Sequence, residues 1–159
     1  MKRHVLLIIL MVAVVPGCQK EKDTKQKQAE TQSPHRTTKK ETTVVVPDAV
    51  RGKWSAVKIK VTDKAGGADK VYTASLGGDF SLPDSRLKVK VLNFLPDFIM
   101  SGATLTSQSN ELKNPAAQIK IYDGDKEIFK GWLFAKFPTT HAFQHPRYGF
   151  TLYDYVPGK

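Results

Sequence analysis

The sequence predicts an all-β fold: a single antiparallel β-sandwich or small barrel-like domain over residues 42–159, preceded by a disordered tether. Three observations predict this fold. Apolar and polar residues alternate in several short segments, which is the period of a half-buried strand. Glycine and aspartate stand between these segments, where tight turns need them. No window of ten or more residues shows the 3.6-residue period of an amphipathic helix.

The first 17 residues are organised as a signal peptide. A short positive start precedes the apolar run Val5–Val15, whose 11 residues are too few for a bilayer-spanning helix of about 20 residues. The run ends in Val15-Pro16-Gly17-Cys18, and Cys18 is the only cysteine of the protein. An aliphatic residue three positions before the cysteine and a small one directly before it resemble the lipobox of bacterial lipoproteins. Pro16 departs from the commoner small residue at its position.

The lipobox resemblance implies that Cys18 receives a diacylglyceryl group, that residues 1–17 are removed, and that a fatty acid such as palmitate acylates the new amino terminus. Two or three lipid chains hold a protein stably on a membrane without spanning it. Because Gln19 rather than Asp follows the cysteine, we expect a cell-envelope protein on the outer membrane, facing the periplasm. The alternative is an ordinary cleaved signal or an uncleaved anchor, with Cys18 incidental. A lipidated Cys18 leaves no thiol for a nucleophile, a redox pair or a thiolate metal site.

Residues 18–41 are predicted to be the lipidated cysteine and its disordered tether. From Gln19 to Glu41 the single apolar residue is Ala29, and seven Lys and Arg stand against four Asp and Glu. Such a segment cannot bury enough apolar surface to fold. We expect it to hold the domain away from the lipid surface. Contact of its lysines with anionic headgroups is an open alternative.

The strands of the domain are predicted from residue 43 onward. Apolar residues alternate with lysine or other polar residues in Val57–Val61, Leu87–Val91 and Gln118–Tyr122. Weaker candidates are Thr43–Val46, Val71–Leu76, Phe98–Thr106 and Tyr148–Tyr155. Turns are expected at Asp63–Asp69, Gly77–Asp79 and Tyr122–Asp125, and Asp123-Gly124 is the strongest hairpin signal. One short turn of helix is expected within Val46–Trp54.

The segment Glu127–Tyr155 holds nine of the fifteen aromatic residues. Its first part predicts a strand with two different faces. One face is apolar and reads as core (Phe129, Gly131, Leu133, Ala135 and Phe137), with the small residues leaving room for large neighbours. The other face is mixed (Ile128, Lys130, Trp132, Phe134 and Lys136). Either a second layer covers this mixed face, or Lys130, Trp132, Phe134 and Lys136 form a partly exposed binding strip.

The segment after Pro138 is predicted to be an ordered loop, because proline cannot donate to a strand ladder. It contains the candidate loop site His141, His145 and Tyr148. Two histidines four apart could face one metal on a helix, but Pro138 and Pro146 leave little room for one, and no third ligand is marked by spacing. We therefore predict no metal site. Packing histidines, or a pH-sensitive contact, are the interpretations left open.

The residues IFKGWLFA from Ile128, followed by Pro138 and by His145-Pro146-Arg147-Tyr148, resemble the hallmark of the bacterial envelope family DUF2155. The resemblance covers mainly Ala117–Leu152. Gly149 and Phe150 depart from it, since they replace an acidic residue and the residue after it. The resemblance implies a secreted or envelope-anchored β-rich domain, and it implies no activity, because none is assigned to the family.

The sequence carries no nucleophile elbow, zinc-protease motif or phosphate-binding loop, so no catalytic residue and no cofactor is predicted. The net charge of +10 would suit nucleic acid, but an envelope location excludes that partner. The leading hypothesis is a non-catalytic module that contacts another envelope protein. The alternative is a module that handles a lipid, haem or metal through His141 and His145. The polar loop Thr106–Asn114 is either a recognition loop or a solvated connector.

Overall fold

The computed structural model describes residues 41–159. The predicted signal peptide, Cys18 and the tether up to residue 40 lie outside the described residues. The described part has ten strands: β1 (Thr43–Val44), β2 (Trp54–Asp63), β3 (Lys70–Ser75), β4 (Asp79–Ser81), β5 (Leu87–Leu95), β6 (Phe98–Ser101), β7 (Thr104–Ser107), β8 (Ala116–Asp123), β9 (Lys126–Phe134) and β10 (Tyr148–Pro157). Residues 41–159 contain no helix, so none of them could cross a membrane as a helix. The all-β prediction is confirmed.

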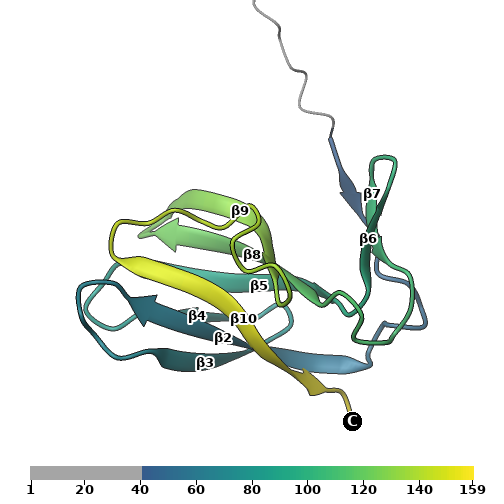
Figure 1. Ribbon diagram of the computed structural model, residues 1–159, viewed down its shortest axis with the longest axis horizontal. Helices are drawn as coiled ribbons and strands as arrows, with labels where there is room; N and C mark the ends of the chain where they lie inside the picture. Colours follow the sequence, from purple (N-terminus) through teal and green to yellow (C-terminus); the bar gives the residue numbers. More distant parts are fainter. Residues whose placement is uncertain (1–40) are drawn as a thin grey trace, which may run out of the picture. The chain divides into compact units, whose positions relative to one another are not determined.

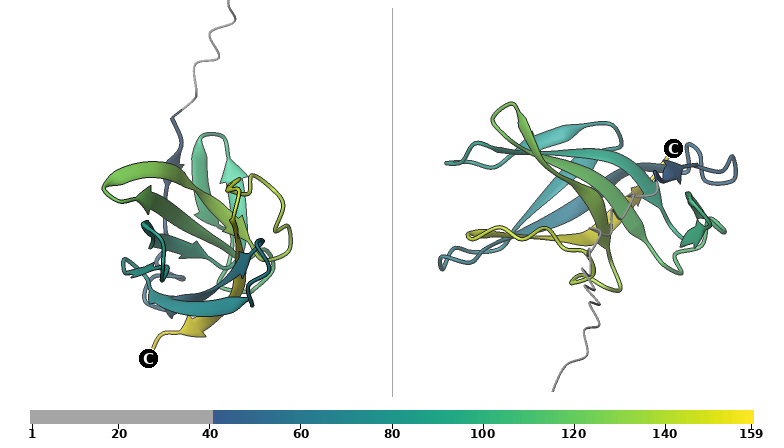
Figure 2. Two further views of the ribbon diagram at one scale, coloured as in Figure 1. Left: turned by 90° about the vertical axis from the view of Figure 1, so that its left-hand side faces the viewer. Right: turned by 90° about the horizontal axis from the view of Figure 1, so that it is seen from above.

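The strands form two main sheets with a common core (Figure 1). One sheet has the order β10-β2-β3 and the other β4-β5-β8-β9, and every pairing within them is antiparallel. Figure 2 shows the two sheets curling around the space between them in the end-on view. The inner faces carry the apolar residues of the predicted alternation: Val57, Ile59, Val89, Val91, Ile119 and Ile121 are all 0% exposed. The lysines between them point outward, as the period of two requires.

The two sheets are joined at one corner and meet without backbone pairing at the other. At the first corner, Leu76 donates its N–H to Ser55 of one sheet, while Gly77 and Gly78 bond to Val91 of the other. The chain between β3 and β4 therefore continues across the corner, where Gly77 has a φ of 83° that favours glycine. At the opposite corner, β9 and β10 lie side by side, and the loop between them fills the seam with side chains, as described below.

A third, smaller sheet has the order β1-β7-β6. The predicted strand Phe98–Thr106 is thus two strands, because Gly102 turns the chain with a φ of 62°. β1 pairs with β7 in parallel, and the β6–β7 hairpin stands beside the sandwich in Figure 1. The hairpin predicted at Asp123-Gly124 is confirmed between β8 and β9, with a φ of 60° at Gly124. Within Val46–Trp54, where a short turn of helix is expected, Val50 and Arg51 both donate their N–H groups to the carbonyl of Pro47 and form a single turn.

Candidate functional site

The mixed face of β9 is covered by the small sheet. Trp132 is 9% exposed, and its ring contacts Phe98 of β6 edge-on at 4.9 Å between centroids. Phe98 also meets Phe134 at 5.0 Å. Leu95, Leu105 and Ala116 complete a second core cluster around Trp132. Of the two interpretations of this face, the structure has the covered one, so Trp132 is a core residue and the predicted exposed strip is not formed around it.

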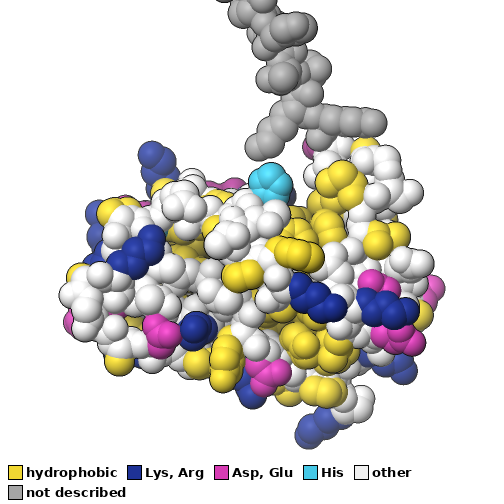
Figure 3. All heavy atoms as spheres, in the orientation of Figure 1, with side chains coloured by type: hydrophobic (Ala, Val, Ile, Leu, Met, Phe, Trp, Pro, Cys, Tyr) yellow, Lys and Arg dark blue, Asp and Glu magenta, His cyan; other side chains and the backbone are white. Residues whose placement is uncertain are grey.

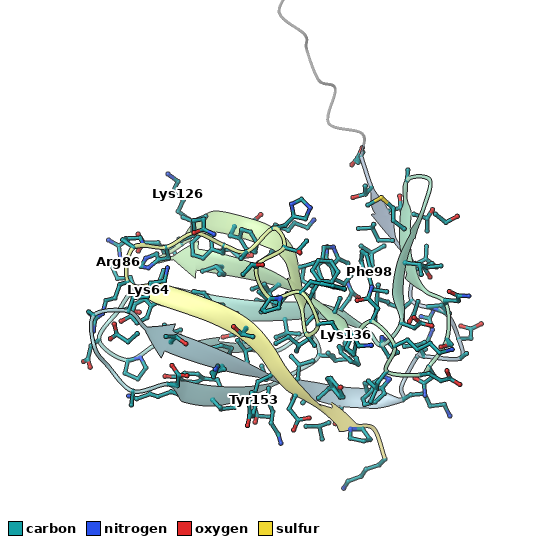
Figure 4. All side chains as sticks on the ribbon, in the orientation of Figure 1. Lys64, Arg86, Phe98, Lys126, Lys136 and Tyr153 are labelled. Carbon is teal, nitrogen blue, oxygen red and sulfur yellow. The ribbon has the colours of Figure 1, made fainter. Side chains whose placement is uncertain are left out.

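The four residues of the expected strip are divided between two environments. Trp132 and Phe134 lie under the small sheet, whereas Lys130 is exposed farther along the same outer face of β9. Lys136 is exposed beyond the end of the strand, where the small sheet meets the sandwich (Figure 4). Phe137, predicted to face the core, is 57% exposed. That prediction is wrong because the strand ends at Phe134 and the alternation ends with it.

On the apolar face of β9, Gly131 leaves room for a large neighbouring side chain, as predicted. The ring of Phe129 lies directly over Gly131, so that a Cβ at Gly131 would overlap the end of this ring. Such a ring shields the backbone of a strand glycine and fills the space that its missing side chain leaves. Phe129 in turn packs on Phe143 of the following loop, at 5.1 Å between centroids.

The loop after β9, residues 135–147, closes the seam between β9 and β10 and is called the seam loop below. Phe143 lies between Phe129 of β9 and Phe150 of β10, at centroid distances of 5.1 Å and 6.0 Å. The ring of His145 is near Phe143 at 5.9 Å and stacks on Tyr148 at 5.4 Å. The rings of Phe143, His145 and Tyr148 therefore connect β9 and β10, whose backbones are not paired.

His145 is a structural residue in this loop. Its Nδ1 accepts hydrogen bonds from the backbone N–H groups of Arg147 (3.2 Å) and Tyr148 (3.1 Å). An imidazole nitrogen that accepts two N–H groups has no free lone pair for a metal. The structure thus brings His145 and Tyr148 together and leaves His141 exposed, with a φ of 51°. Residues 41–159 contain no group of three His, Cys, Asp or Glu side chains placed to hold a metal ion.

Sequence reasoning missed an ion pair at the start of β10. The guanidinium of Arg147 donates from Nε and Nη2 to the carboxylate of Asp63, at distances between 2.9 and 3.2 Å. The backbone N–H of Ala65 also donates to this carboxylate, at 3.0 Å. The hydrogen bonds from Arg147, followed by that from Ala65, hold the pKa of Asp63 below its usual value. The pair ties the loop after β9 to the β2–β3 turn.

A small pocket of about 170 Å³ opens beside this ion pair. Its walls combine apolar residues and Tyr148 of the sandwich end with charged residues of both signs: Asp63, Lys70, Asp84 and Arg147. Asp84 has a φ of 55°, which few non-glycine residues adopt. The only sequence signal for this pocket was the cluster of turn aspartates, which reads equally well as turn chemistry.

We expect the contribution of Asp63 to stability to depend on pH. The pKa of Asp63 is lowered in the fold, so the pair stabilises the protein fully above the ordinary value of 3.8 and is lost as pH falls through the lower folded pKa. The free energy of unfolding of Asp63→Asn should therefore be lower than that of the parent at neutral pH. This difference should shrink below pH 3.8. Urea denaturation across this range measures it. Asp125→Asn is the matched control, because Asp125 is exposed; an equal pH trend in both variants would contradict the assignment.

The loop Thr106–Asn114 is held by internal hydrogen bonds. Ser107 accepts the backbone N–H of Asp97, and Ser109 donates to the Asp97 carboxylate, both at 2.8 Å. At the tip of the loop, Asn110 accepts the indole N–H of Trp54 at 2.8 Å. These bonds fix the loop against the body of the domain.

The comparisons with known proteins give one positive result. No curated protein and no solved structure matches the chain. Residues 98–154, from β6 to the middle of β10, match the model of a family described as an uncharacterized protein conserved in bacteria (DUF2155). This segment contains the small-sheet hairpin, β8, β9, the seam loop and most of β10. The family resemblance inferred from the sequence is therefore confirmed for residues 98–154, which are similar to the bacterial DUF2155 family.

Proposed function

We propose that the chain is a lipid-anchored protein of the bacterial cell envelope, whose β-domain is a non-catalytic module that contacts another envelope protein. The lipobox-like end at Cys18 and the match to a bacterial family support the anchor and the setting. In this proposal the signal peptide 1–17 is removed and the tether 18–41 carries the domain. The lipid on Cys18 holds the protein on the outer membrane, facing the periplasm.

Replacing Cys18 by serine is expected to abolish fatty-acid attachment and to release the protein from the membrane fraction. Serine has no thiol to which a diacylglyceryl group could be transferred, and without two or three chains no stable anchor remains. Labelling cells with a radioactive palmitate precursor, followed by fractionation, measures both effects. Gln19→Asp is the matched control, since it keeps the cysteine. It should retain the label and shift the protein toward the inner membrane; label remaining on Cys18→Ser would contradict the anchor.

Two exposed apolar side chains, Met100 of β6 and Phe137 after β9, carry the binding proposal. Met100 is 61% exposed and Phe137 is 57% exposed. Met100 is on the same face of β6 as Phe98, which packs on the second core cluster. Figure 3 shows hydrophobic side chains gathered at the junction of the small sheet and the sandwich, and Figure 4 places Lys136 there. Aromatic residues and methionine are enriched at protein interfaces, and exposed groups of them mark such sites.

The partner that fits this junction is a protein with an apolar side chain flanked by acidic residues. Apolar groups of the partner would be buried against Met100 and against Phe137, and its acidic residues would pair with Lys136, which precedes Phe137 in the chain. Charged groups at a rim contribute mainly to orientation and to the rate of association. The burial of the apolar groups supplies most of the affinity.

Met100→Asp combined with Phe137→Asp is expected to abolish crosslinking to a partner in living cells. A photoreactive amino acid in place of Lys136 would capture the partner in the parent background, and a carboxylate in the apolar contact carries a desolvation cost that removes it. Tyr153→Asp is the control, because Tyr153 is 61% exposed on β10, away from the junction (Figure 4). The proposal fails if the crosslinked species persists in the double variant, or if Tyr153→Asp removes it equally.

A further inference from the structure

Three lysines form a row across the outer face of the sheet β4-β5-β8-β9. Lys90 of β5 lies directly opposite Lys120 of β8, and Lys120 lies directly opposite Lys130 of β9. In the adjoining row, Lys88 stands beside Tyr122, with its ammonium 5.5 Å from the centre of the ring. Strands in a sheet are about 4.8 Å apart, so the row brings three lysine side chains onto one small area of the outer face.

This arrangement costs stability within the protein, because like charges directly opposite each other on neighbouring strands repel. Only one ion pair relieves it among the described residues of this face: Lys120 bonds to Glu127 at 2.7 Å. Asp79 of β4 is in register with Lys90 but makes no described ion pair with it. This face therefore carries more positive than negative side chains: Lys88, Lys90, Lys120 and Lys130 stand against Asp79 and Glu127.

The opposite sheet shows how lysines on such a face can be neutralised. On the outer side of β2, Lys58 pairs with Asp154 of β10 at 2.8 Å, and Lys60 pairs with Asp69 at 3.2 Å. Both lysines of that face thus have a carboxylate, whereas Lys88, Lys90 and Lys130 make no described ion pair. The excess positive charge is therefore found on the outer face of β5, β8 and β9 and not on the outer face of β2.

We propose that the part of the outer face of β5, β8 and β9 around Lys90, Lys120 and Lys130 binds the anionic headgroups of a phospholipid membrane. The ammonium groups would pair with lipid phosphates, which removes their mutual repulsion. The sheet presents these ammonium groups together on one outer face, and Tyr122 beside them is a residue type enriched at membrane interfaces. Each lysine close to an anionic membrane raises the binding constant about fivefold.

This inference rests on the proposed membrane attachment for the proximity of the lipid, and it is independent of the proposed protein partner. Attachment alone would bring the domain near any membrane, whatever its headgroups. The lysine row would bring this particular face onto the surface only where the lipid is anionic. The two properties are therefore separable by changing the headgroup while keeping the anchor.

The test uses the full chain, purified from a bacterial host and reconstituted into vesicles. One set contains phosphatidylcholine alone, and the other contains equal parts of phosphatidylcholine and phosphatidylglycerol. Lysine acetylation rates are read residue by residue by mass spectrometry. Lys88, Lys90 and Lys130 are expected to react several-fold more slowly on the anionic vesicles, with the protection removed by high salt. Lys53 and Lys159, which are exposed on other parts of the domain, should react equally in both.

Paired variants separate the lysine row from total charge. Lys90→Gln with Lys130→Gln should remove the protection of Lys88 on anionic vesicles, whereas Lys53→Gln with Lys159→Gln, which removes the same charge, should leave it. Equal acetylation in both vesicle types would overturn the inference, as would protection by soluble polyphosphate but not by anionic vesicles. Co-sedimentation with the phosphatidylcholine vesicles reports the anchor separately. A chain that fails to sediment with them refutes the attachment, while one that sediments without protection refutes only the lysine face.

Discussion

Replacing Trp132 by alanine is expected to lower the free energy of unfolding by about 3–5 kcal/mol, the usual cost of removing a large aromatic side chain from a core. The indole is 9% exposed and fills the space between β9 and the small sheet. Its contact with Phe98 at 4.9 Å is an edge-on aromatic pair that stabilises beyond its buried area. Alanine would leave a cavity lined by rigid strands, which cannot collapse to fill it.

The effect of Trp132→Ala should be concentrated where the small sheet docks. Amide hydrogen exchange in Phe98–Ser101 is expected to increase more than exchange in β2, because the small sheet loses its main apolar contact. Tyr153→Ala is the control in urea denaturation, since a 61% exposed side chain should cost within about 0.5 kcal/mol. A loss of stability as small as that of the control would mean that Trp132 is not the centre of this cluster.

The sequence predicted the strands well because their signal is local. The alternation in Val57–Val61 and the pair Asp123-Gly124 report the conformation of their own backbone, and both are found as expected. The environment of Trp132 was not predictable in the same way. The residues that cover it belong to another hairpin, and a face that alternates Lys130 with Trp132 is equally compatible with a solvated strip and with a strand that is half covered.

The seam loop shows a second limit of local reasoning. His145-Pro146-Arg147-Tyr148 was visible as a motif, yet its chemistry depends on contacts outside it. Arg147 meets a carboxylate 84 residues away in the chain. His145, by contrast, acts within the motif, because its Nδ1 accepts the N–H groups two and three residues later. In this segment, packing and hydrogen bonding account for the positions of His145, Arg147 and Tyr148.

Replacing Gly131 by valine is expected to lower the free energy of unfolding by about 1–3 kcal/mol, the cost of inserting side-chain volume into packed space. Valine favours a strand more than glycine does, so backbone preference alone predicts the opposite sign. Steric overlap decides the sign instead, because the new Cβ would meet the end of the Phe129 ring. A shift of that ring would disturb its contact with Phe143, which closes the seam between β9 and β10.

The damage from Gly131→Val should therefore appear in the seam loop, as faster amide exchange around Phe143 with little change in β8. Gly149→Ala in β10 is the matched control: its added Cβ would lie 3.7 Å from the nearest atom, an ordinary contact, and should be tolerated. Gly131→Val should also cost less when Phe129 is already leucine, since the shorter side chain no longer covers the glycine. Additive losses of stability in this double variant would show that the ring and the glycine are independent, contrary to their contact in the structure. A reduced loss would identify the glycine of the GWLFA motif as the space in which Phe129 lies, and hence as a determinant of how the loop after β9 is held.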